Sequence, residues 1–275
     1  MTVYKQLVDE KNELLDLGNL LEAYEDLAAE KIQKVKADIL ACRDFYEGLA
    51  KLSDMVGKDF EDIGLKKKEA AIFIASNTGL YGDIIEKIFI LFLDFIKKNK
   101  VDIFVAGKLG ESLMKNYAEN FKFFSLTLPD TVIDECLLKK TVGRVISYRR
   151  IHVFYGKFKN LTFQHSEKTS ISGDFLPKNS KEWEMIENRD LNFVYEPSIV
   201  AVSEVLTKEI LSSLLERLLK ESLLARFASR LMHLDESLEK NKNMIKKIDF
   251  NKHSVRKKNL DRKQNAMISN LIIRK

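Results

Sequence analysis

The sequence predicts an α/β protein in which long helices at the two ends of the chain form an antiparallel coiled coil and an α/β domain lies between them. Two features lead to this prediction. The last 78 residues, 198–275, contain neither glycine nor proline, the strongest local breakers of regular structure. In the middle of the chain, short β-branched runs alternate with helical stretches, which is typical of a parallel sheet with crossover helices. We expect an N-terminal helix over 1–60, a central domain over 68–200 and a C-terminal helix over 201–275.

The N-terminal helix is predicted from apolar residues that recur every seven positions. The row consists of Leu7, Leu14, Leu21, Ala28, Val35, Cys42 and Leu49. Gly18 interrupts the pattern, and Gly48 stands near its end. A heptad row of this kind is the seam of a coiled coil, and the small residues Ala28 and Ala29 would let a second helix approach closely.

The C-terminal helix would reach roughly 115 Å at about 1.5 Å per residue, several times the width of a small domain. Because its own chain cannot bury it, we expect it to wind around a partner helix. Its seam consists of Leu224, Leu231, Leu238 and Ile245 in one row and Phe227, Leu234, Asn241, Ile248 and Val255 in the other. Asn241 breaks the apolar seam, and it either fixes the register or faces water. The alternative is a long amphipathic helix on a globular core, but caps would be expected within about 25 residues.

The central domain is predicted from strand–helix–strand segments. The runs 70–75 and 101–106 are short and apolar, and each precedes a glycine and a helical stretch. This order predicts a Rossmann-like parallel sheet. Segments 145–155 and 161–165 alternate in polarity around a short connection that contains Gly156, so we expect an antiparallel hairpin added to the sheet. The terminal helices then form a shaft, and the central domain forms its head.

No candidate site for catalysis or ligand binding in the sequence matches a known motif. The loop 76–82 lies where a phosphate-binding loop would lie, but it lacks the lysine and the glycine spacing of such loops. The four histidines, at positions 152, 165, 233 and 253, show no metal-ligand spacing and have no cysteine grouped with them. Spacing singles out no pair of carboxylates as acid and base. We therefore predict no catalytic, cofactor-binding or metal-binding residue, and no enzymatic activity of the chain by itself.

Composition places the protein in the cytoplasm. No apolar run approaches the roughly 18 residues that span a bilayer, and the N-terminus lacks the pattern of a signal peptide. Two cysteines, Cys42 and Cys136, are too few for a disulfide framework. We expect both thiols to be reduced.

Charge is concentrated at the C-terminal end. Residues 240–275 hold twelve Lys or Arg and two Asp, a local net charge of +10 in a chain whose net charge is +5. A basic helical end of this kind fits nucleic acid, an anionic membrane or an acidic protein surface, and it can also be a merely solvated face.

A series of short motifs runs in one order along the chain. The motifs are Leu27-Ala28-Ala29-Glu30-Lys31-Ile32, the loop Ser76–Gly82, Gly107-Lys108-Leu109-Gly110, Tyr155-Gly156-Lys157-Phe158-Lys159-Asn160, Leu176-Pro177, Tyr195-Glu196-Pro197, Glu221-Ser222, Arg230-Leu231-Met232-His233-Leu234 and Arg256. Together they resemble the gamma subunit of F-type ATP synthases over nearly the whole chain. The loop, for example, is similar to the S-D-R-G-L-C-G of that family.

The resemblance implies a noncatalytic rotor shaft inside a hexameric ring of nucleotide-binding alpha-like and beta-like subunits, which couples ATP hydrolysis or synthesis to rotation. It also implies an epsilon-like stalk subunit, with or without a membrane rotor ring, and a location peripheral to the inner face of the cell membrane. Nucleic acid is not among the implied partners. Because an acidic loop of each catalytic subunit pushes on the shaft in that family, we expect the ring contacts at Arg256, Lys257, Lys258, Asp261, Arg262, Lys263, Glu25 and Lys31.

The chain departs from the family pattern at two places. Asp261, Lys263 and Gln264 replace threonine, glutamate and leucine at the tip, and 24–26 replaces M-K-M in the first helix.

Two kinds of motor stay open, an ordinary ATP synthase and a specialised F-type-like ATPase that powers another process, such as motility or surface transport. From other function classes there remain a static coiled-coil adaptor and a basic nucleic-acid-binding protein. No aromatic residue follows Phe250 in the basic segment, which weakens the last of these.

Overall fold

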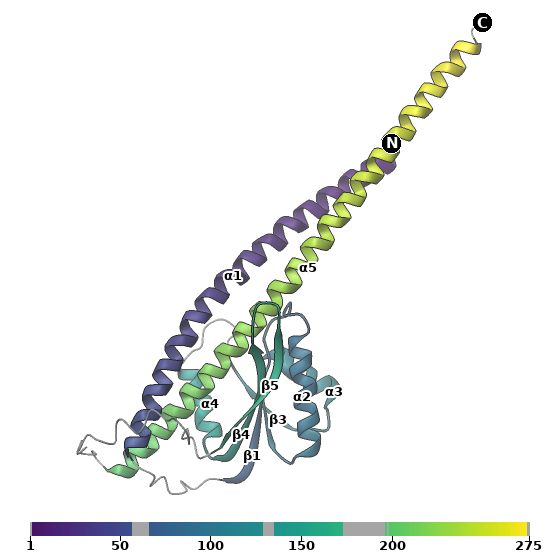
Figure 1. Ribbon diagram of the computed structural model, residues 1–275. Helices are drawn as coiled ribbons and strands as arrows, with labels where there is room; N and C mark the ends of the chain where they lie inside the picture. Colours follow the sequence, from purple (N-terminus) through teal and green to yellow (C-terminus); the bar gives the residue numbers. More distant parts are fainter. Residues whose placement is uncertain (1, 57–65, 129–134, 173–195, 197, 274–275) are drawn as a thin grey trace. The chain divides into compact units, whose positions relative to one another are not determined.

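A computed structural model describes residues 2–56, 66–128, 135–172, 196 and 198–273 (Figure 1). The chain divides into two compact units. Unit 1 combines residues 1–30 with residues 230–275, and unit 2 contains residues 31–229. The two long helices therefore contribute to both units.

The two terminal helices are present as predicted. Helix α1 (Thr2–Val56) has 55 residues, and helix α5 (Ile199–Ile273) has 75. Helix α5 is unbroken because nothing in its sequence obliges the backbone to turn. Helix α1 continues through Gly18 and Gly48, each of which costs about 1 kcal/mol relative to alanine, so packing rather than propensity must hold α1 there.

Unit 2 is built around a five-stranded sheet with the order β3-β2-β1-β4-β5. The strands are β1 (Lys66–Ile74), β2 (Asp102–Ala106), β3 (Phe123–Leu126), β4 (Tyr148–Phe158) and β5 (Gln164–Ser172). The first four run parallel to their neighbours, and β5 is antiparallel to β4. This sheet confirms the predicted Rossmann-like α/β domain.

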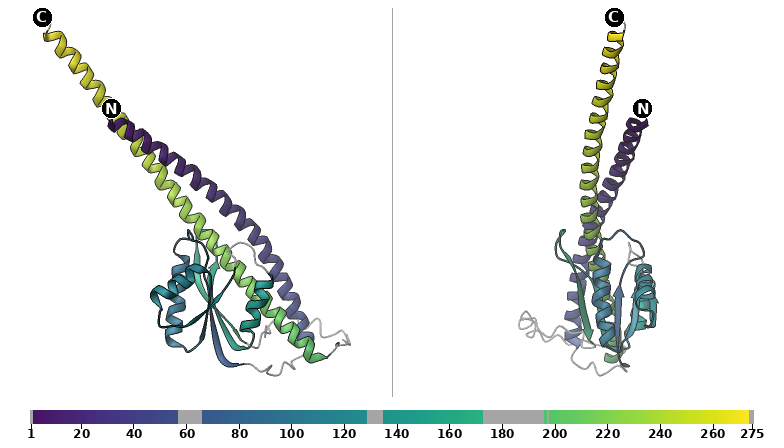
Figure 2. Two further views of the ribbon diagram at one scale, coloured as in Figure 1. Left: turned by 180° about the vertical axis from the view of Figure 1, so that it is seen from behind. Right: turned by 90° about the vertical axis from the view of Figure 1, so that its right-hand side faces the viewer.

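Helices cover both faces of the sheet (Figures 1 and 2). Helices α2 (Ile84–Lys98) and α3 (Lys108–Tyr117) lie on one face. There Phe73 of β1 stacks on Phe92 of α2 with ring centroids 5.2 Å apart, and Phe154 of β4 meets the same ring edge-on. Helix α4 (Glu135–Val145) and the part of α5 in unit 2 lie on the other face.

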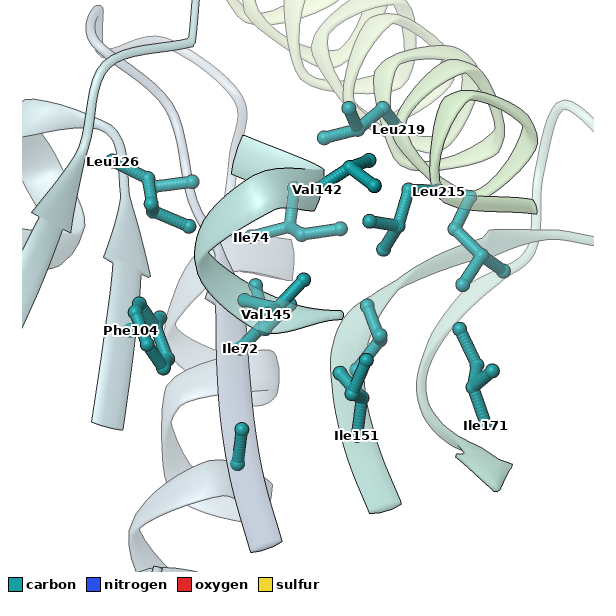
Figure 3. Close-up of a cluster of buried hydrophobic side chains, with 14 of the residues drawn as sticks. Ile72, Ile74, Phe104, Leu126, Val142, Val145, Ile151, Ile171, Leu215 and Leu219 are labelled. Carbon is teal, nitrogen blue, oxygen red and sulfur yellow. The ribbon is translucent and has the colours of Figure 1, made fainter. Parts of the chain in front are cut away.

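The second face holds an apolar core of its own. Ile72 and Ile74 alternate with Phe73 along β1, so they point to the side of α4 and α5. Figure 3 shows them among the side chains of Phe104, Leu126, Val142, Val145, Ile151, Ile171, Leu215 and Leu219. Strand β1 is buried on both faces over 70–74, which explains why its sequence is continuously apolar there.

The predicted hairpin forms, but its turn lies later than expected. Gly156 lies inside β4 opposite Ser166, not in the connection. A Cβ at this position would stand 3.2 Å from the Cβ of Ala225 in α5 and 3.3 Å from Cγ1 of Ile84. Glycine is therefore required for close packing rather than for turning. The turn follows at residues 159–163, where the amide N–H of Phe163 donates to Oδ1 of Asn160.

Three parts of the sequence motifs lie outside the described residues. These are the motif Leu176-Pro177 and the residues Tyr195 and Pro197.

Candidate partner-binding site

Within unit 1, α1 and α5 form an antiparallel pair (Figure 2). Its α5 side buries Leu234, Leu238, Asn241 and Ile248. On α1 the residues Leu7, Leu14 and Leu21 are half-buried. These residues all belong to the rows found by their seven-residue spacing.

Polar contacts cross this pair at several levels. The Nζ of Lys11 lies 2.7 Å from both carboxylate oxygens of Asp249, and the Nζ of Lys252 lies 5.9 Å from the ring centre of Tyr4. The hydrogen bond from Lys11 lowers the pKa of Asp249 below its ordinary value. These contacts pair early residues of α1 with late residues of α5, as an antiparallel arrangement requires.

Asn241 is buried in the seam, with 2% of its surface exposed. Its Nδ2 donates to the backbone oxygen of Leu14 at 2.8 Å, while its Oδ1 is buried without a partner among the described residues. A Cβ on Gly18 would lie 3.1 Å from that Nδ2. The interruption at Gly18 therefore makes room for Asn241, and the water-facing interpretation of Asn241 is wrong.

The expected ring contacts fall into two groups. Six of them lie exposed on the last part of α5, which belongs to unit 1, namely Arg256, Lys257, Lys258, Asp261, Arg262 and Lys263. Glu25 is half-buried in unit 1, and Lys31 is half-buried in unit 2. The structure thus gathers the six α5 residues on one helical segment and gives Glu25 and Lys31 less solvent access.

Sequence spacing missed a second set of accessible residues in unit 1. These are large apolar side chains outside the heptad rows, and they are exposed: Leu15, Leu17, Leu20, Tyr24 and Leu27 on α1 and Met244, Phe250, Leu260, Met267 and Ile268 on α5. In the sequence they could have been found as apolar residues at heptad positions outside the rows that form the seam. Apolar residues grouped on an exposed surface are typical of partner-binding sites.

The carboxyl edge of the sheet in unit 2 is where α/β proteins of this topology usually bind ligands. Here the chain's own groups occupy the start of α3. The backbone N–H of Lys108 donates to Oδ1 of Asn77 at 3.1 Å, and that of Leu109 donates to the oxygen of Ser76 at 2.9 Å. These amides, which could bind an anion at a helix N-terminus, hold the loop 76–82 instead.

The same loop is anchored to α5. Arg226 donates from Nη1 to the oxygen of Ala75 at 3.0 Å, and its guanidinium lies 5.5 Å from the ring centre of Tyr81. Ser229 donates from Oγ to the oxygen of Tyr81 at 2.8 Å. The loop 76–82, which lies where a phosphate-binding loop would lie, therefore connects the end of β1 to α5.

His152 is held inside unit 2. Its Nδ1 lies 2.8 Å from Oγ of Ser170, and its Nε2 lies 2.9 Å from Oε2 of Glu69. The ring of Phe95 covers the imidazole at a centroid distance of 4.7 Å. This serine–histidine–glutamate row joins three neighbouring strands, and α2 lies over it.

Comparison with known proteins places this geometry in a family. The model of the family described as ATP synthase matches residues 12–262. The chain belongs to the ATP synthase family. The family relationship that the motifs predicted is thereby confirmed.

Curated relatives within the ATP synthase family match almost end to end. The ATP synthase gamma chain of Buchnera aphidicola (strain Tuc7) is 23% identical over 98% of this chain and 97% of its own length. That of Christiangramia forsetii is 23% identical over 80% of each chain. That of Neisseria meningitidis serogroup C is 21% identical over 90% of this chain and 91% of its own.

Solved structures of ATP synthases show the same fold at low sequence identity. A chain of the Tetrahymena thermophila mitochondrial ATP synthase, in a structure of the central stalk and c-ring, superposes with a TM-score of 0.59 at 15% identity. The match covers 79% of this chain and 99% of that chain. A chain from the Euglena gracilis enzyme gives a TM-score of 0.52 at 13% identity, over 93% and 94% of the two chains. Among the described residues, no helix is long and apolar enough to span a bilayer.

Proposed function

We propose that this protein is the noncatalytic central shaft of an F-type rotary ATPase, which couples ATP hydrolysis or synthesis in a surrounding ring to rotation. The observation that carries the proposal is the match to ATP synthase gamma chains over nearly the full length of both proteins. The solved relative from Tetrahymena is part of a central stalk, and we assign the corresponding role to this chain.

The surface of unit 1 supports this role. A pair of helices has one seam, yet both α1 and α5 also expose large apolar side chains outside it, such as Tyr24 and Phe250. A surrounding protein would remove these side chains from water at a gain of about 25 cal/mol per Å² of apolar surface. A ring of subunits around the helical pair provides such a cover.

Contacts with the ring are assigned to the basic end of α5. The side chains are exposed and cationic at Arg256, Lys257, Lys258, Arg262 and Lys263, which suits acidic loops on the catalytic subunits. Asp261 lies in the same segment, and Glu25 and Lys31 add contacts from α1. We further propose that the chain divides functionally into an N-terminal helix over 1–60, a central domain over 68–200 and a C-terminal helix over 201–275.

The central domain is assigned to the coupling end, where an epsilon-like stalk subunit docks. Through the complex, the protein would lie in the cytoplasm at the inner face of the membrane. Any attachment to a membrane rotor ring is then made through partner proteins.

Reconstitution with the ring subunits of the same organism tests the shaft role. We expect the complex to hydrolyse ATP and the isolated chain to have no turnover. A disulfide between the end of α5 and a ring subunit should stop hydrolysis until it is reduced. ATP hydrolysis by the isolated chain, or full turnover in the cross-linked complex, would contradict the proposal, and the second result would favour a static adaptor.

A specialised motor that lacks proton transport is the second candidate. The observation that favours it is the altered tip, where Asp261, Lys263 and Gln264 change the charge of the segment assigned to the ring. Purification of the complex from its host separates the two. Proton-channel ring subunits in the complex identify an ATP synthase, and an active ATPase complex without them identifies the specialised motor.

A nucleic-acid-binding role predicts different behaviour of the isolated chain. A basic segment that binds DNA or RNA loses affinity steeply as salt rises, in proportion to the phosphates it neutralises. Tight binding with such a slope, together with failure to assemble with ring subunits, would replace the shaft proposal.

A further inference from the structure

The parallel strands of unit 2 all begin at one edge of the sheet, which we call the amino edge. Strands β1, β2, β3 and β4 run in the same direction, so their first residues lie near one another there. Helices α2 and α3 each follow one strand and precede the next, so they end at this edge too (Figure 1). The opposite edge, where such folds usually bind ligands, is the one at which the loop 76–82 lies. Side chains at the starts of strands and the ends of helices therefore share the amino edge as one surface.

The amino edge is basic. Six exposed cations lie at the end of α2, in the connections that precede β2 and β3, and near the starts of β1 and β4: Lys97, Lys98, Lys100, Lys122, Lys68 and Arg149. They come from four separate parts of the sequence, so no single charged run reveals them. The fold gathers this charge at one edge.

Carboxylates at the amino edge compensate only part of this charge. Asp102, the first residue of β2, accepts a hydrogen bond from Oη of Tyr148 at 2.8 Å. Glu69 on β1 lies 2.9 Å from Nε2 of His152 and 3.5 Å from Nη1 of Arg150. The exposed carboxylates at this end of unit 2 are Asp94 on α2, Glu119 before β3 and Glu204 in the first turns of α5, where Lys208 is also exposed. The described residues therefore leave the amino edge with a net positive charge.

Two exposed aromatic residues adjoin the cations. Tyr117 is the last residue of α3, and Phe124 is the second residue of β3, the outermost strand on that side of the sheet. They are 70% and 58% exposed, and Lys122 lies between them in the sequence. A cationic surface with exposed aromatic residues is typical of proteins that lie on an anionic membrane. Lys and Arg are attracted to the lipid phosphates, and amphipathic rings enter the headgroup layer.

The amino edge and the basic end of α5 are separate cationic surfaces. Helix α5 contacts the carboxyl edge at Arg226 and Ser229, immediately before the point at which it leaves unit 2. The residues assigned to the ring lie beyond that point along α5, whereas the amino edge lies at the other end of unit 2. A ring that covers the end of α5 therefore leaves the amino edge to a different anionic partner.

We propose that the amino edge of unit 2 binds an anionic phospholipid surface. Its Lys and Arg side chains pair with headgroup phosphates, and Tyr117 and Phe124 enter the headgroup layer. The cations are spread over several elements instead of following one groove, which suits a broad membrane surface better than a nucleic-acid strand. The inference is independent of the proposed function, because a shaft needs no lipid contact of its own.

Cosedimentation of the full chain with vesicles tests the lipid chemistry. The vesicles consist of phosphatidylcholine alone or of phosphatidylcholine mixed with phosphatidylglycerol. We expect binding to the mixed vesicles at least about tenfold tighter than to phosphatidylcholine alone, and loss of this difference as salt screens the charges. Equal binding to both kinds of vesicle, or no binding to either, overturns the proposal.

Matched substitutions locate the binding. Lys97→Glu with Lys98→Glu should weaken binding to the mixed vesicles about tenfold. The control is Lys87→Glu with Lys108→Glu, which makes the same charge change at exposed positions near the starts of α2 and α3, at the carboxyl edge. If circular dichroism shows that the first variant is unfolded, Lys97→Gln with Lys98→Gln should still weaken binding about threefold. Equal losses in the control overturn the assignment to the amino edge.

A tryptophan reporter distinguishes the amino edge from the basic end of α5. Tyr117→Trp and, at an exposed position of α5, Met267→Trp are each made in a chain whose native tryptophan is removed by Trp183→Phe. Vesicles whose lipids carry bromine on the acyl chains quench a tryptophan that enters the membrane. We expect quenching at position 117 and at least about threefold less at position 267. The reverse order would assign membrane binding to the end of α5 and overturn the proposal.

An acidic protein or a nucleic acid is the other occupant to test. Binding of the full chain to a polyglutamate peptide and to a single-stranded RNA is measured beside the vesicles. Binding to either one that Lys97→Glu with Lys98→Glu abolishes, with no binding to the mixed vesicles, would replace lipid by that partner. Failure to assemble with ring subunits would count against the proposed function alone, since vesicle binding by the isolated chain decides the inference.

Discussion

Single glycines set how closely β1, β2 and α3 approach in unit 2. Gly107, between β2 and α3, has φ near +100°, which L side chains rarely adopt. A Cβ there would lie 2.7 Å from the backbone of Ser76. At Gly110 a Cβ would lie 2.7 Å from the Cβ of Ala75. Both glycines of the Gly107–Gly110 motif therefore serve the contact between α3 and the end of β1.

Gly107→Ala should lower the free energy of unfolding by about 3 kcal/mol, because it adds backbone strain to a steric clash. Urea unfolding followed by circular dichroism measures the change. Gly143→Ala is the control, since Gly143 lies in α4 with nothing within 4 Å of an added Cβ, and it should stabilise by about 0.5–1 kcal/mol. Equal losses in both variants would contradict this explanation.

Glu221 is a second residue whose surroundings have a measurable effect. Burial raises its pKa above the ordinary value of glutamate, although Lys157 and Arg217 act in the opposite direction. The folded protein therefore keeps this proton to higher pH than the unfolded chain. As pH rises through the ordinary glutamate pKa toward the raised one, the unfolded state loses its proton first, and stability falls.

Glu221→Gln should accordingly raise the free energy of unfolding at pH 7 and change it little below about pH 4, where glutamate is protonated in both states. Urea unfolding at the two pH values measures both effects. Glu239→Gln, at an exposed position on the same helix, is the control and should change the free energy of unfolding by less than about 0.5 kcal/mol. Destabilisation at pH 7 would mean that the attraction of Lys157 and Arg217 for the Glu221 carboxylate outweighs its burial.

At the scale of elements, the helix pair of unit 1 combines an apolar seam with a few polar contacts of fixed geometry. The Asn241 amide reaches the backbone of α1 only because Gly18 has no side chain. A buried polar group of this kind lowers stability but favours one register, since any shift leaves it without its partner. We interpret Asn241 as the residue that fixes the alignment of α1 and α5.

Asn241→Leu should stabilise the helix pair by about 1 kcal/mol, because it removes a buried and partly unpaired amide, but it should loosen the register. Thermal unfolding measures the first effect. The second is measured by the yield of cross-linking between Lys11→Cys and Asp249→Cys with a short bifunctional maleimide, which spans the distance between two positions whose native side chains meet at their tips, Nζ to Oδ1, at 2.7 Å. The yield should fall in the Asn241→Leu background. An unchanged yield would assign the register to the apolar residues alone.

At the scale of the whole molecule, the distribution of charge governs assembly. A cationic segment at the end of α5 speeds encounter with an acidic partner, and the effect declines as salt screens it. The proposed contacts at the tip therefore affect the association rate more than the final affinity.

Lys257→Glu combined with Lys258→Glu should slow association with the ring subunits about tenfold at low salt, and the difference should shrink at high salt. Association followed by surface-immobilised binding kinetics measures this rate. Lys97→Glu with Lys98→Glu makes the same charge change at the exposed end of α2 and should leave the rate within about twofold. Faster association of the tip variant would mean that the ring contact is basic.

Signals that act between near neighbours were sufficient to predict the two helices, the parallel strands and the hairpin. The absence of breakers over 198–275 and the seven-residue rows depend only on local sequence, as do the apolar runs of β1 and β2. Strand β3 and helix α4 were not predicted. Strand β3 has four residues, of which only Leu126 is buried, and such a short edge segment carries almost no periodic signal.

The sequence by itself determined the fold class, the family and the concentration of positive charge near the C-terminus, because composition, periodicity and ordered motifs record these directly. Only the tertiary structure decided what Gly156, Arg226 and Asn241 do. Arg226 binds the oxygen of a residue 151 positions away, and Gly156 is required by a helix that passes 69 positions later along the chain. Contacts between residues so far apart in the sequence do not change the pattern of the residues next to them. The roles of these three residues can therefore be recognised only in the folded chain.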